Sequence, residues 1–195
     1  PQDVADVAKS VKPLLRKNQI LVSIAAGKTL AGLKRLFGAN PAVVRVMPNL
    51  ALRSGAGMSA VTSSPKTSEK IVASVASLLS KAGKSIVLKE KDFDAVTALS
   101  GSGPAYFAYM AEAMMEGGVK LGLKKDAALL LSLQTMYGTA KFLLENNVPL
   151  KDFINGVCTK GGTTAAGMTK LVNPEFKNIV ADTLAAAAKR SKELA

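Results

Sequence analysis

The chain of 195 residues is long enough to bury one large core or two small ones, and its 48% hydrophobic content excludes a disordered protein. It has no histidine and one cysteine, which excludes a histidine-based catalytic triad, a His-ligated zinc site and an internal disulfide. The formal net charge of +12 suggests nucleic acid, but the basic residues are scattered and aromatic residues are few, so we expect no nucleic-acid partner and a solvated basic surface instead.

The first part of the chain alternates between helical and strand patterns. Apolar residues at helical spacing predict helices, and short apolar runs rich in β-branched residues predict buried strands. The expected helices are Asp3–Lys17, Gly27–Phe37 and Ser68–Ala82, and the expected strands are Ile20–Ile24, Val43–Met47, Ser59–Thr62 and Ser85–Leu88. This alternation is typical of a parallel sheet covered by helices.

Two of these strands end in small or polar residues. Ala25, Ala26 and Gly27 follow the first strand, and Met47, Pro48 and Asn49 end or follow the second. In open parallel sheets ligands bind beyond the carboxyl ends of the strands, where small residues allow close approach of a flat ring. Taken singly, each segment is also an ordinary strand-to-helix turn, and the chain contains no G-x-G-x-x-G phosphate-binding turn.

After Asp92 the strands stop and helices follow. The expected helices are Pro104–Leu121, Lys125–Glu145, Val148–Val157, Thr163–Leu171 and one that begins at Asn173-Pro174. The first is apolar on nearly all sides, so we expect a partner subunit to cover part of it. The expected fold class is therefore α/β followed by all-α: a partial Rossmann-type parallel sheet at 1–91, and a helical, intertwined dimerisation domain at 92–195.

Two polar, glycine-rich turns precede helices in this second part. One is Ser100–Pro104 and the other is Gly161–Thr164. A turn of this kind directs unpaired N–H groups and the positive end of the helix dipole at one point, which favours a small anion such as a carboxylate. Each turn alone is also explained as an ordinary helix cap.

The single cysteine and the absence of a long apolar run bear on location. Cys158 lies two positions before Lys160, but no histidine is present as a base, so a buried, inert thiol is favoured over a nucleophile. One cysteine fits a reducing compartment, and we expect a cytoplasmic protein. No uninterrupted apolar run approaches the roughly 18 residues that cross a bilayer, so we expect a soluble protein without a membrane partner.

These motifs, in this order, resemble those of the pyrroline-5-carboxylate reductases, which catalyse the last step of proline biosynthesis. The similarity extends over essentially the whole chain and is carried by Ser23–Gly27, Arg45–Asn49, Ala98–Tyr106, Gln134-Thr135, Gly138–Lys141, Gly161–Thr164 and Ala185–Ser191. The resemblance implies an oxidoreductase that reduces the cyclic imine of 1-pyrroline-5-carboxylate to L-proline with NADPH or NADH. It also implies a Rossmann-type cofactor domain and self-association into a homodimer or a higher homo-oligomer.

The resemblance further implies a role for each site residue. The substrate carboxylate would lie against Gly161, Gly162 and Thr163, and the hydroxyl of Thr164 would approach the ring nitrogen as the catalytic residue. The nicotinamide end of the cofactor would contact the residues that follow the two strands, which are Ala25, Ala26, Gly27, Met47, Pro48 and Asn49. No metal is implied.

The chain departs from the family pattern in three places. The family's opening strand–helix units, with their glycine-rich turn, would precede Pro1, so we expect residues 1–195 alone to bind cofactor poorly and to be inactive. Thr159-Lys160 stands where many relatives have Ser-Pro, and Leu50-Ala51 stands where Thr-Pro commonly follows Met-Pro-Asn.

Two other interpretations remain open on the sequence. One is a non-catalytic helical dimerisation module without a cofactor half. The other is a β-hydroxyacid-type dehydrogenase with a helical C-terminal domain, which would use a catalytic lysine and would leave Gly161–Thr164 unexplained.

Overall fold

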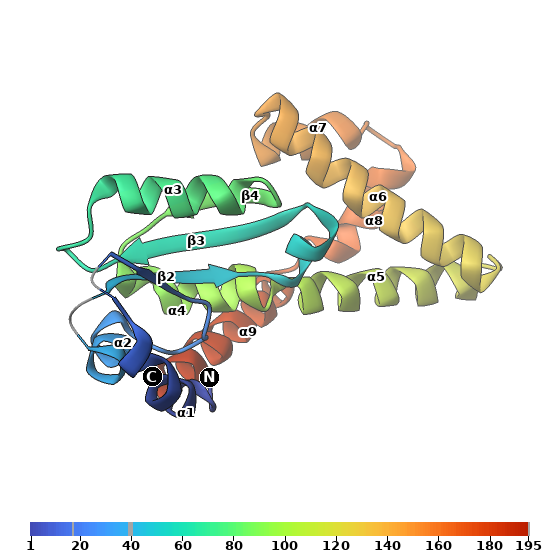
Figure 1. The fold of residues 1–195 in the computed structure, drawn as a ribbon. Helices are drawn as coiled ribbons and strands as arrows, with labels where there is room; N and C mark the ends of the chain where they lie inside the picture. Colours follow the sequence, from blue (N-terminus) through green and yellow to red (C-terminus); the bar gives the residue numbers. More distant parts are fainter. Residues whose placement is uncertain (17, 39–40, 195) are drawn as a thin grey trace. The chain divides into compact units, whose positions relative to one another are not determined.

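The computed structural model describes residues 1–16, 18–38 and 41–194. The chain divides into two compact units. The first unit comprises Pro1–Pro104 and Asp182–Ala195, and the second comprises Ala105–Ala181. The predicted class, α/β followed by all-α, is confirmed, because all the described strands lie in the first unit and the second is helical (Figure 1). The assignment of functional domains to 1–91 and 92–195 stays a prediction.

The first unit is built on a four-stranded sheet with the order β1-β2-β3-β4. The strands are β1 (Ile20–Ser23), β2 (Ala42–Pro48), β3 (Gly57–Ser63) and β4 (Gly83–Val87). β1 is parallel to β2, with Ile20 opposite Ala42 and Ser23 opposite Arg45, and β3 is parallel to β4. All four predicted strands are confirmed within a few residues at each end.

The predicted parallel sheet is found for the pairs β1–β2 and β3–β4, but β3 runs antiparallel to β2, with Val46 opposite Val61. Only the short 3₁₀ turn η2 (Leu50–Ser54) and a few flanking residues connect these strands. A parallel pair requires a crossover of about a dozen residues or more, usually a helix, so this connection can only reverse the chain. The sheet is therefore mixed.

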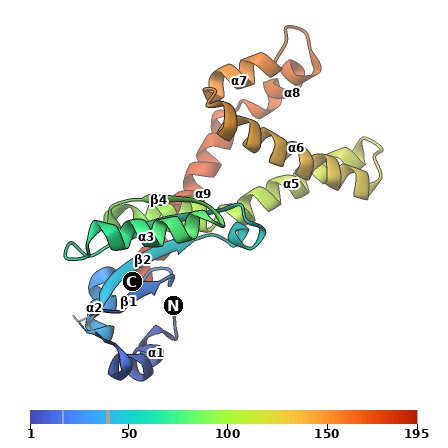
Figure 2. The ribbon, with the colours of Figure 1, turned by 45° about the horizontal axis from the view of Figure 1, so that its top comes forward.

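Helices cover both faces of this sheet (Figures 1 and 2). α1 (Val4–Val11) and α2 (Leu30–Phe37) pack on the face that carries Val43, and α3 (Glu69–Ser80) packs on the face that carries Val44. Side chains alternate between faces along a strand, so β2 supplies both cores. The core residues on the first face are Ala8, Leu30, Leu33, Phe37 and Val43, and those on the second are Val44, Val46, Val61 and Val75.

The predicted first helix, Asp3–Lys17, is too long. α1 ends at Val11 and continues only as the 3₁₀ turn η1 (Lys12–Leu14). Pro13 has no N–H to donate and its ring crowds the preceding turn, which explains the early end. Position 17 lies outside the described residues.

The first predicted turn, Ser100–Pro104, is also different in the structure. A 3₁₀ turn η3 (Glu90–Asp92), α4 (Phe93–Val96) and a π-helical turn η4 (Thr97–Gly101) precede α5 (Gly103–Lys120). The segment is thus an almost continuous helical rod, in which the N–H of Ser102 donates to the carbonyl O of Thr97 across 2.9 Å. Sequence reasoning missed α4, and the amide of Ser102, just before α5, is paired within the rod and not directed at an anion.

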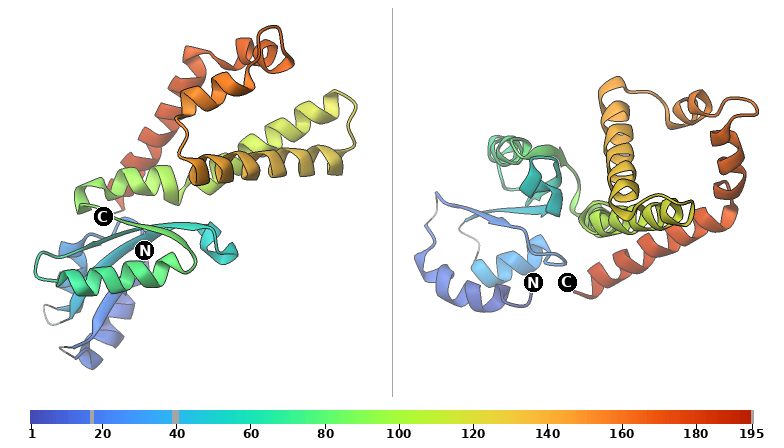
Figure 3. Two further views of the ribbon diagram at one scale, coloured as in Figure 1. Left: turned by 90° about the horizontal axis from the view of Figure 1, so that it is seen from above. Right: turned by 90° about the vertical axis from the view of Figure 1, so that its right-hand side faces the viewer.

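The second unit contains most of α5, then α6 (Lys125–Asn146), α7 (Leu150–Val157), α8 (Thr163–Leu171) and the beginning of α9 (Pro174–Glu193). α5 and α6 meet at the turn that joins them and diverge away from it (Figures 1 and 2), and α7 and α8 follow α6 and lead into α9 (Figure 3). The rings of Phe142 and Phe153, 5.4 Å apart between centroids, join α6 to α7. The predicted bounds of α8 are confirmed at both ends.

Large apolar side chains of α5 and α6 remain exposed in the single chain. Tyr109 is 74% exposed and Leu130 is 67% exposed. Judged by length and composition, α6 is apolar enough to cross a membrane. The helix contains no uninterrupted apolar run, because Ser132, Gln134 and Thr135 lie within it. Apolar surface of this extent requires a covering surface from another molecule.

Candidate functional site

The carboxyl ends of β1 and β2 bring the first set of predicted site residues together. Because Ser23 lies opposite Arg45 in a parallel pair, Ala25–Gly27, which follow β1, lie at the same edge of the sheet as Met47–Asn49, which end and follow β2. Ala25 and Ala26 are half-buried and carry only a methyl group each. A cavity of about 640 Å³ beside them is lined by Ser23–Ala26 and by apolar residues of α1. The carboxyl end of β1 is therefore bordered by small and apolar side chains, which suit a flat ring.

Asn49 joins this edge to β3 through two hydrogen bonds. The N–H of Asn49 donates to the carbonyl O of Met58, and the Oδ1 of Asn49 accepts from the N–H of Met58, each across 3.1 Å. These bonds hold the plane of the side-chain amide. Its Nδ2 group is therefore the part of Asn49 that could donate to a carboxamide or hydroxyl of a ligand.

The side chain of Met47 packs toward the π-helical turn η4. A Cβ built on Gly101 would lie on the terminal methyl of Met47, so the two residues are in close contact. The neighbouring Oγ of Ser100 is buried, with no hydrogen-bond partner in the described part of the chain. The turn Ser100–Pro104 thus packs against the end of β2. The sequence instead predicted an anion-binding site at this turn.

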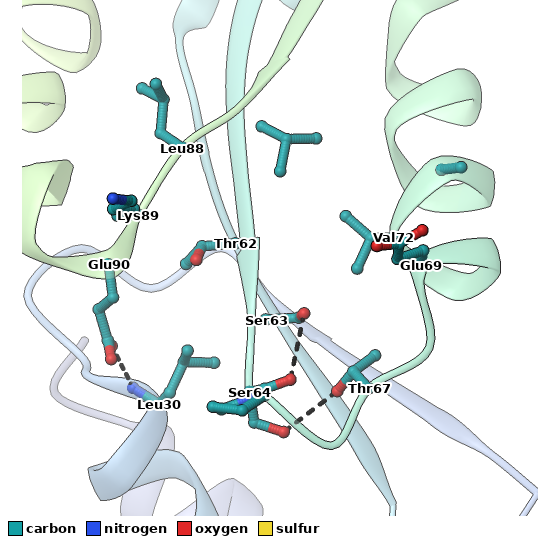
Figure 4. A pocket seen from close by; sticks show the side chains of 13 residues that line it. Leu30, Thr62, Ser63, Ser64, Thr67, Glu69, Val72, Leu88, Lys89 and Glu90 are labelled. Atoms are coloured by element: carbon teal, nitrogen blue, oxygen red, sulfur yellow. Dashed lines mark hydrogen bonds between the residues drawn. The ribbon is translucent and has the colours of Figure 1, made fainter.

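Sequence reasoning missed a charged group behind this edge. Arg45, only 4% exposed, donates from Nη1 to Oε1 of Glu90 across 3.3 Å, and its guanidinium lies 4.7 Å from the ring centroid of Phe93. Oε1 of Glu90 also accepts from the N–H of Leu30 at the start of α2, across 2.5 Å (Figure 4). The sequence contained one indication of this ion pair. Arg45 is a cation inside the apolar run Val43–Met47, and a buried charge requires a partner of opposite charge.

The cavity drawn in Figure 4 lies at another part of the sheet. It has a volume of about 670 Å³ and is lined by the ends of β3 and β4, the start of α3 and residues Leu30, Lys89 and Glu90. Hydroxyl groups line one side, where Ser64 and Thr67 bond each other at 3.1 Å (Figure 4). None of the predicted site residues lines this cavity, so we assign it no part in the reaction.

The second predicted set, Gly161–Thr164, forms the turn that opens α8 in the second unit. Gly161 has a left-handed φ of 76°, and the N–H of Gly162 donates to the carbonyl O of Thr159 across 2.9 Å. Gly162 is the N-cap residue, and the first bond within the helix runs from the N–H of Ala166 to the carbonyl O of Gly162. The amides of Thr163 and Thr164 therefore lie in the first turn, where a helix has no internal acceptors. Thr164 is half-buried and Thr163 is exposed.

The two sets lie in different units, so each is defined by its own geometry. The first set forms an apolar edge with one amide donor, and the second forms the amino end of a helix. The described residues contain no group of three or more acidic, cysteine or histidine side chains that could hold a metal ion. Cys158 is half-buried at the end of α7.

Comparisons with known proteins identify relatives of the whole chain. A family model described as pyrroline-5-carboxylate reductase dimerisation matches residues 90–194. The pyrroline-5-carboxylate reductase of Glycine max is 39% identical over 194 residues, which cover all of this chain and 70% of the soybean protein.

Two solved structures are similar to the whole chain, each at 30% identity. The pyrroline-5-carboxylate reductase of Coxiella burnetii superposes with a TM-score of 0.93 over 100% of this chain and 73% of its own. The pyrroline carboxylate reductase of Plasmodium falciparum, with NADP bound, superposes with a TM-score of 0.90 over 100% of this chain and 78% of its own.

Proposed function

The chain belongs to the pyrroline-5-carboxylate reductase family, and we propose how its residues carry out the reduction of 1-pyrroline-5-carboxylate to L-proline. The protein is an oxidoreductase that uses NAD(P)H and self-associates through its helical part. The NADP bound in the Plasmodium structure supports NADPH as a cofactor. The non-catalytic module is not favoured, because the match extends over the cofactor-domain residues as well. We also propose a cytoplasmic location, which the single cysteine supports.

The observation that carries the proposal is the open amino end of α8. The amides of its first turn have no helical acceptor, and a carboxylate is the small anion that such a position stabilises. We therefore assign the substrate carboxylate to the turn of Gly161, Gly162 and Thr163, where Thr163 supplies an amide of the first turn and the N–H of Gly162 is already bonded to the carbonyl O of Thr159. Lys160, which directly precedes Gly161, adds a positive charge that favours the same anion.

Thr164 is the residue that would act at the reacting ring. A protonated imine is already electrophilic, so the protein has to orient the ring and stabilise its nitrogen. The hydroxyl of Thr164 can accept a hydrogen bond from a protonated nitrogen and can donate one to the neutral amine of proline. This role requires no histidine, which agrees with the composition of the chain.

The edge formed by β1 and β2 fits the nicotinamide end of the cofactor. The small side chains of Ala25 and Ala26 leave room for a flat ring, and Nδ2 of Asn49 is a donor of the type that binds a carboxamide. When bound, the reduced cofactor supplies a hydride, which the carbon of the imine bond accepts. We assign this contact to Ala25, Ala26, Gly27, Met47, Pro48 and Asn49. Residues 1–195 contain no G-x-G-x-x-G turn, and weak cofactor binding by this segment alone stays a prediction.

A direct assay tests the function. The natural polypeptide is purified and mixed with 1-pyrroline-5-carboxylate and NADPH or NADH, and the loss of reduced cofactor is compared with the L-proline formed. We expect equal amounts of both. Oxidation of a 2-hydroxy acid without reduction of the imine would favour the β-hydroxyacid-type dehydrogenase, and formation of a dimer without turnover of either would favour the non-catalytic module.

A further inference from the structure

The C-terminal end of α9 lies in the first unit, against the loop that follows β1 (Figures 1 and 2). The Nζ of Lys28 donates to the carbonyl O of Leu194 across 3.0 Å. A Cβ built on Gly27 would lie 2.7 Å from Cβ and 3.0 Å from the carbonyl carbon of Leu194. Gly27 also has a φ of 76°, which L side chains rarely adopt. Position 27 therefore accommodates only glycine while Leu194 covers it.

Ser191 anchors this last turn of α9 to α4. Its side chain is 2% exposed, and its Oγ donates to Oδ1 of Asp94 across 2.7 Å, although the two residues are 97 positions apart. A hydrogen bond to a carboxylate is stronger than one between neutral groups. Because the Ser191 side of this bond is buried and Asp94 is half-buried, the bond holds the end of α9 against α4.

The same rod holds the other side of the loop. Glu90, four residues before Asp94, accepts from the N–H of Leu30, the first residue of α2. The loop between β1 and α2 thus lies between two contacts of the rod, one made directly with α2 and one made through α9. These elements surround a cavity of about 360 Å³, lined by Gly27, Thr29, Arg45, Glu90, Asp94 and Lys192 among others.

We propose that the last turn of α9, held by Ser191 on Asp94, is a positioning element for the dinucleotide. Through Leu194 and Lys28 it holds Ala25–Gly27 in the conformation that the nicotinamide end contacts. Ser191 and Asp94 act through the loop and do not touch the cofactor. This inference rests on the proposed function, because it assumes that Ala25–Gly27 contact the cofactor.

The first experiment measures the loop itself and does not depend on activity. In the natural polypeptide, Ser191→Ala removes the hydroxyl that bonds Asp94, and Lys28→Met removes the donor to Leu194. We expect faster hydrogen–deuterium exchange of the amides of residues 24–29 in both variants. Ser77→Ala, an exposed serine of α3, is the matched control and should leave this exchange unchanged. Unchanged exchange of residues 24–29 in Ser191→Ala and Lys28→Met would overturn the proposal.

The second experiment separates positioning from stability. We expect Ser191→Ala to raise the KM and the Kd for NADPH about three- to tenfold, the cost of one lost hydrogen bond, with the KM for 1-pyrroline-5-carboxylate unchanged. Asp94→Asn keeps an acceptor for Ser191 and should have a smaller effect. A fall in melting temperature without a change in the NADPH constants would show a merely structural role. If the unmodified protein does not reduce the imine, the proposed function fails, whereas the exchange measurement still tests the contact.

Discussion

Arg45 and Glu90 form an ion pair behind the edge at which β1 and β2 end. Their Nη1 and Oε1 atoms are 3.3 Å apart, and Arg45 is 4% exposed whereas the side chain of Glu90 is 34% exposed. The pair joins β2 to the rod that begins with η3, and Glu90 adds the contact with the N–H of Leu30. Through Arg45 and Leu30, Glu90 therefore contacts both β2 and the start of α2, the helix that follows Ala25–Gly27.

We expect Glu90→Ala to lower the free energy of unfolding by about 2–4 kcal/mol, because it leaves a buried guanidinium without a carboxylate and the start of α2 without an acceptor. Glu90→Gln should cost less, since its amide oxygen can still accept from Leu30. Denaturant titration measures both values. Glu69→Ala, at an exposed position in the first turn of α3, is the control and should cost less than about 1 kcal/mol. Equal losses for Glu90→Ala and Glu69→Ala would contradict this account of the ion pair.

Asn49 allows its structural and ligand-binding roles to be separated. Asn49→Asp keeps the oxygen that accepts from Met58 but removes the Nδ2 donor, whereas Asn49→Ala removes both. We expect the aspartate variant to keep its melting temperature and to raise the KM for NADPH by roughly tenfold, because the proposed hydrogen-bond donor to the cofactor is lost. The alanine variant should lose stability as well, by about 1 kcal/mol. An aspartate variant with an unchanged KM for NADPH would remove Asn49 from the cofactor site.

Thr164 provides the test of the proposed chemistry. Thr164→Ala should lower kcat by roughly 10- to 100-fold, the effect of one positioned hydrogen bond at the reacting group. Thr164→Ser keeps the hydroxyl and should retain most of the turnover. The control is Thr169→Ala on the same helix, where the hydroxyl donates only to the carbonyl O of Ala166. Steady-state kinetics that are the same for Thr164→Ala and Thr169→Ala would refute the role.

The exposed apolar surface of α6 predicts where self-association occurs. Leu130 on α6 and Leu78 on α3 are each 67% exposed in the single chain, but only Leu130 lies within the segment that matches the dimerisation family. We expect Leu130→Lys to weaken the dimer by about tenfold or more in sedimentation velocity, because a charge enters an apolar interface. Leu78→Lys should leave the dimer intact. Equal effects of the two substitutions would place the interface elsewhere.

The elements that the sequence predicted well are those with strong local patterns. α6 follows from its leucine-rich composition and α8 from the Gly161-Gly162 turn that precedes it, and the strands follow from short apolar runs rich in β-branched residues. The sequence also predicted that Ala25–Gly27 and Met47–Asn49 lie at one edge of a parallel sheet. The parallel pairing of β1 and β2 places them there. The family resemblance was carried by these local motifs and is confirmed by the comparisons.

Local patterns do not reveal the partner of a distant side chain. The reversal at β3, by contrast, follows from the short connection between β2 and β3, whose length can be read from the sequence. The contact of Ser191 with Asp94 joins residues that are 97 positions apart, and nothing in the neighbourhood of either residue indicates the other. Local propensity depends on a few neighbouring residues, whereas this contact forms only when separate elements pack together, so the tertiary structure alone decided it.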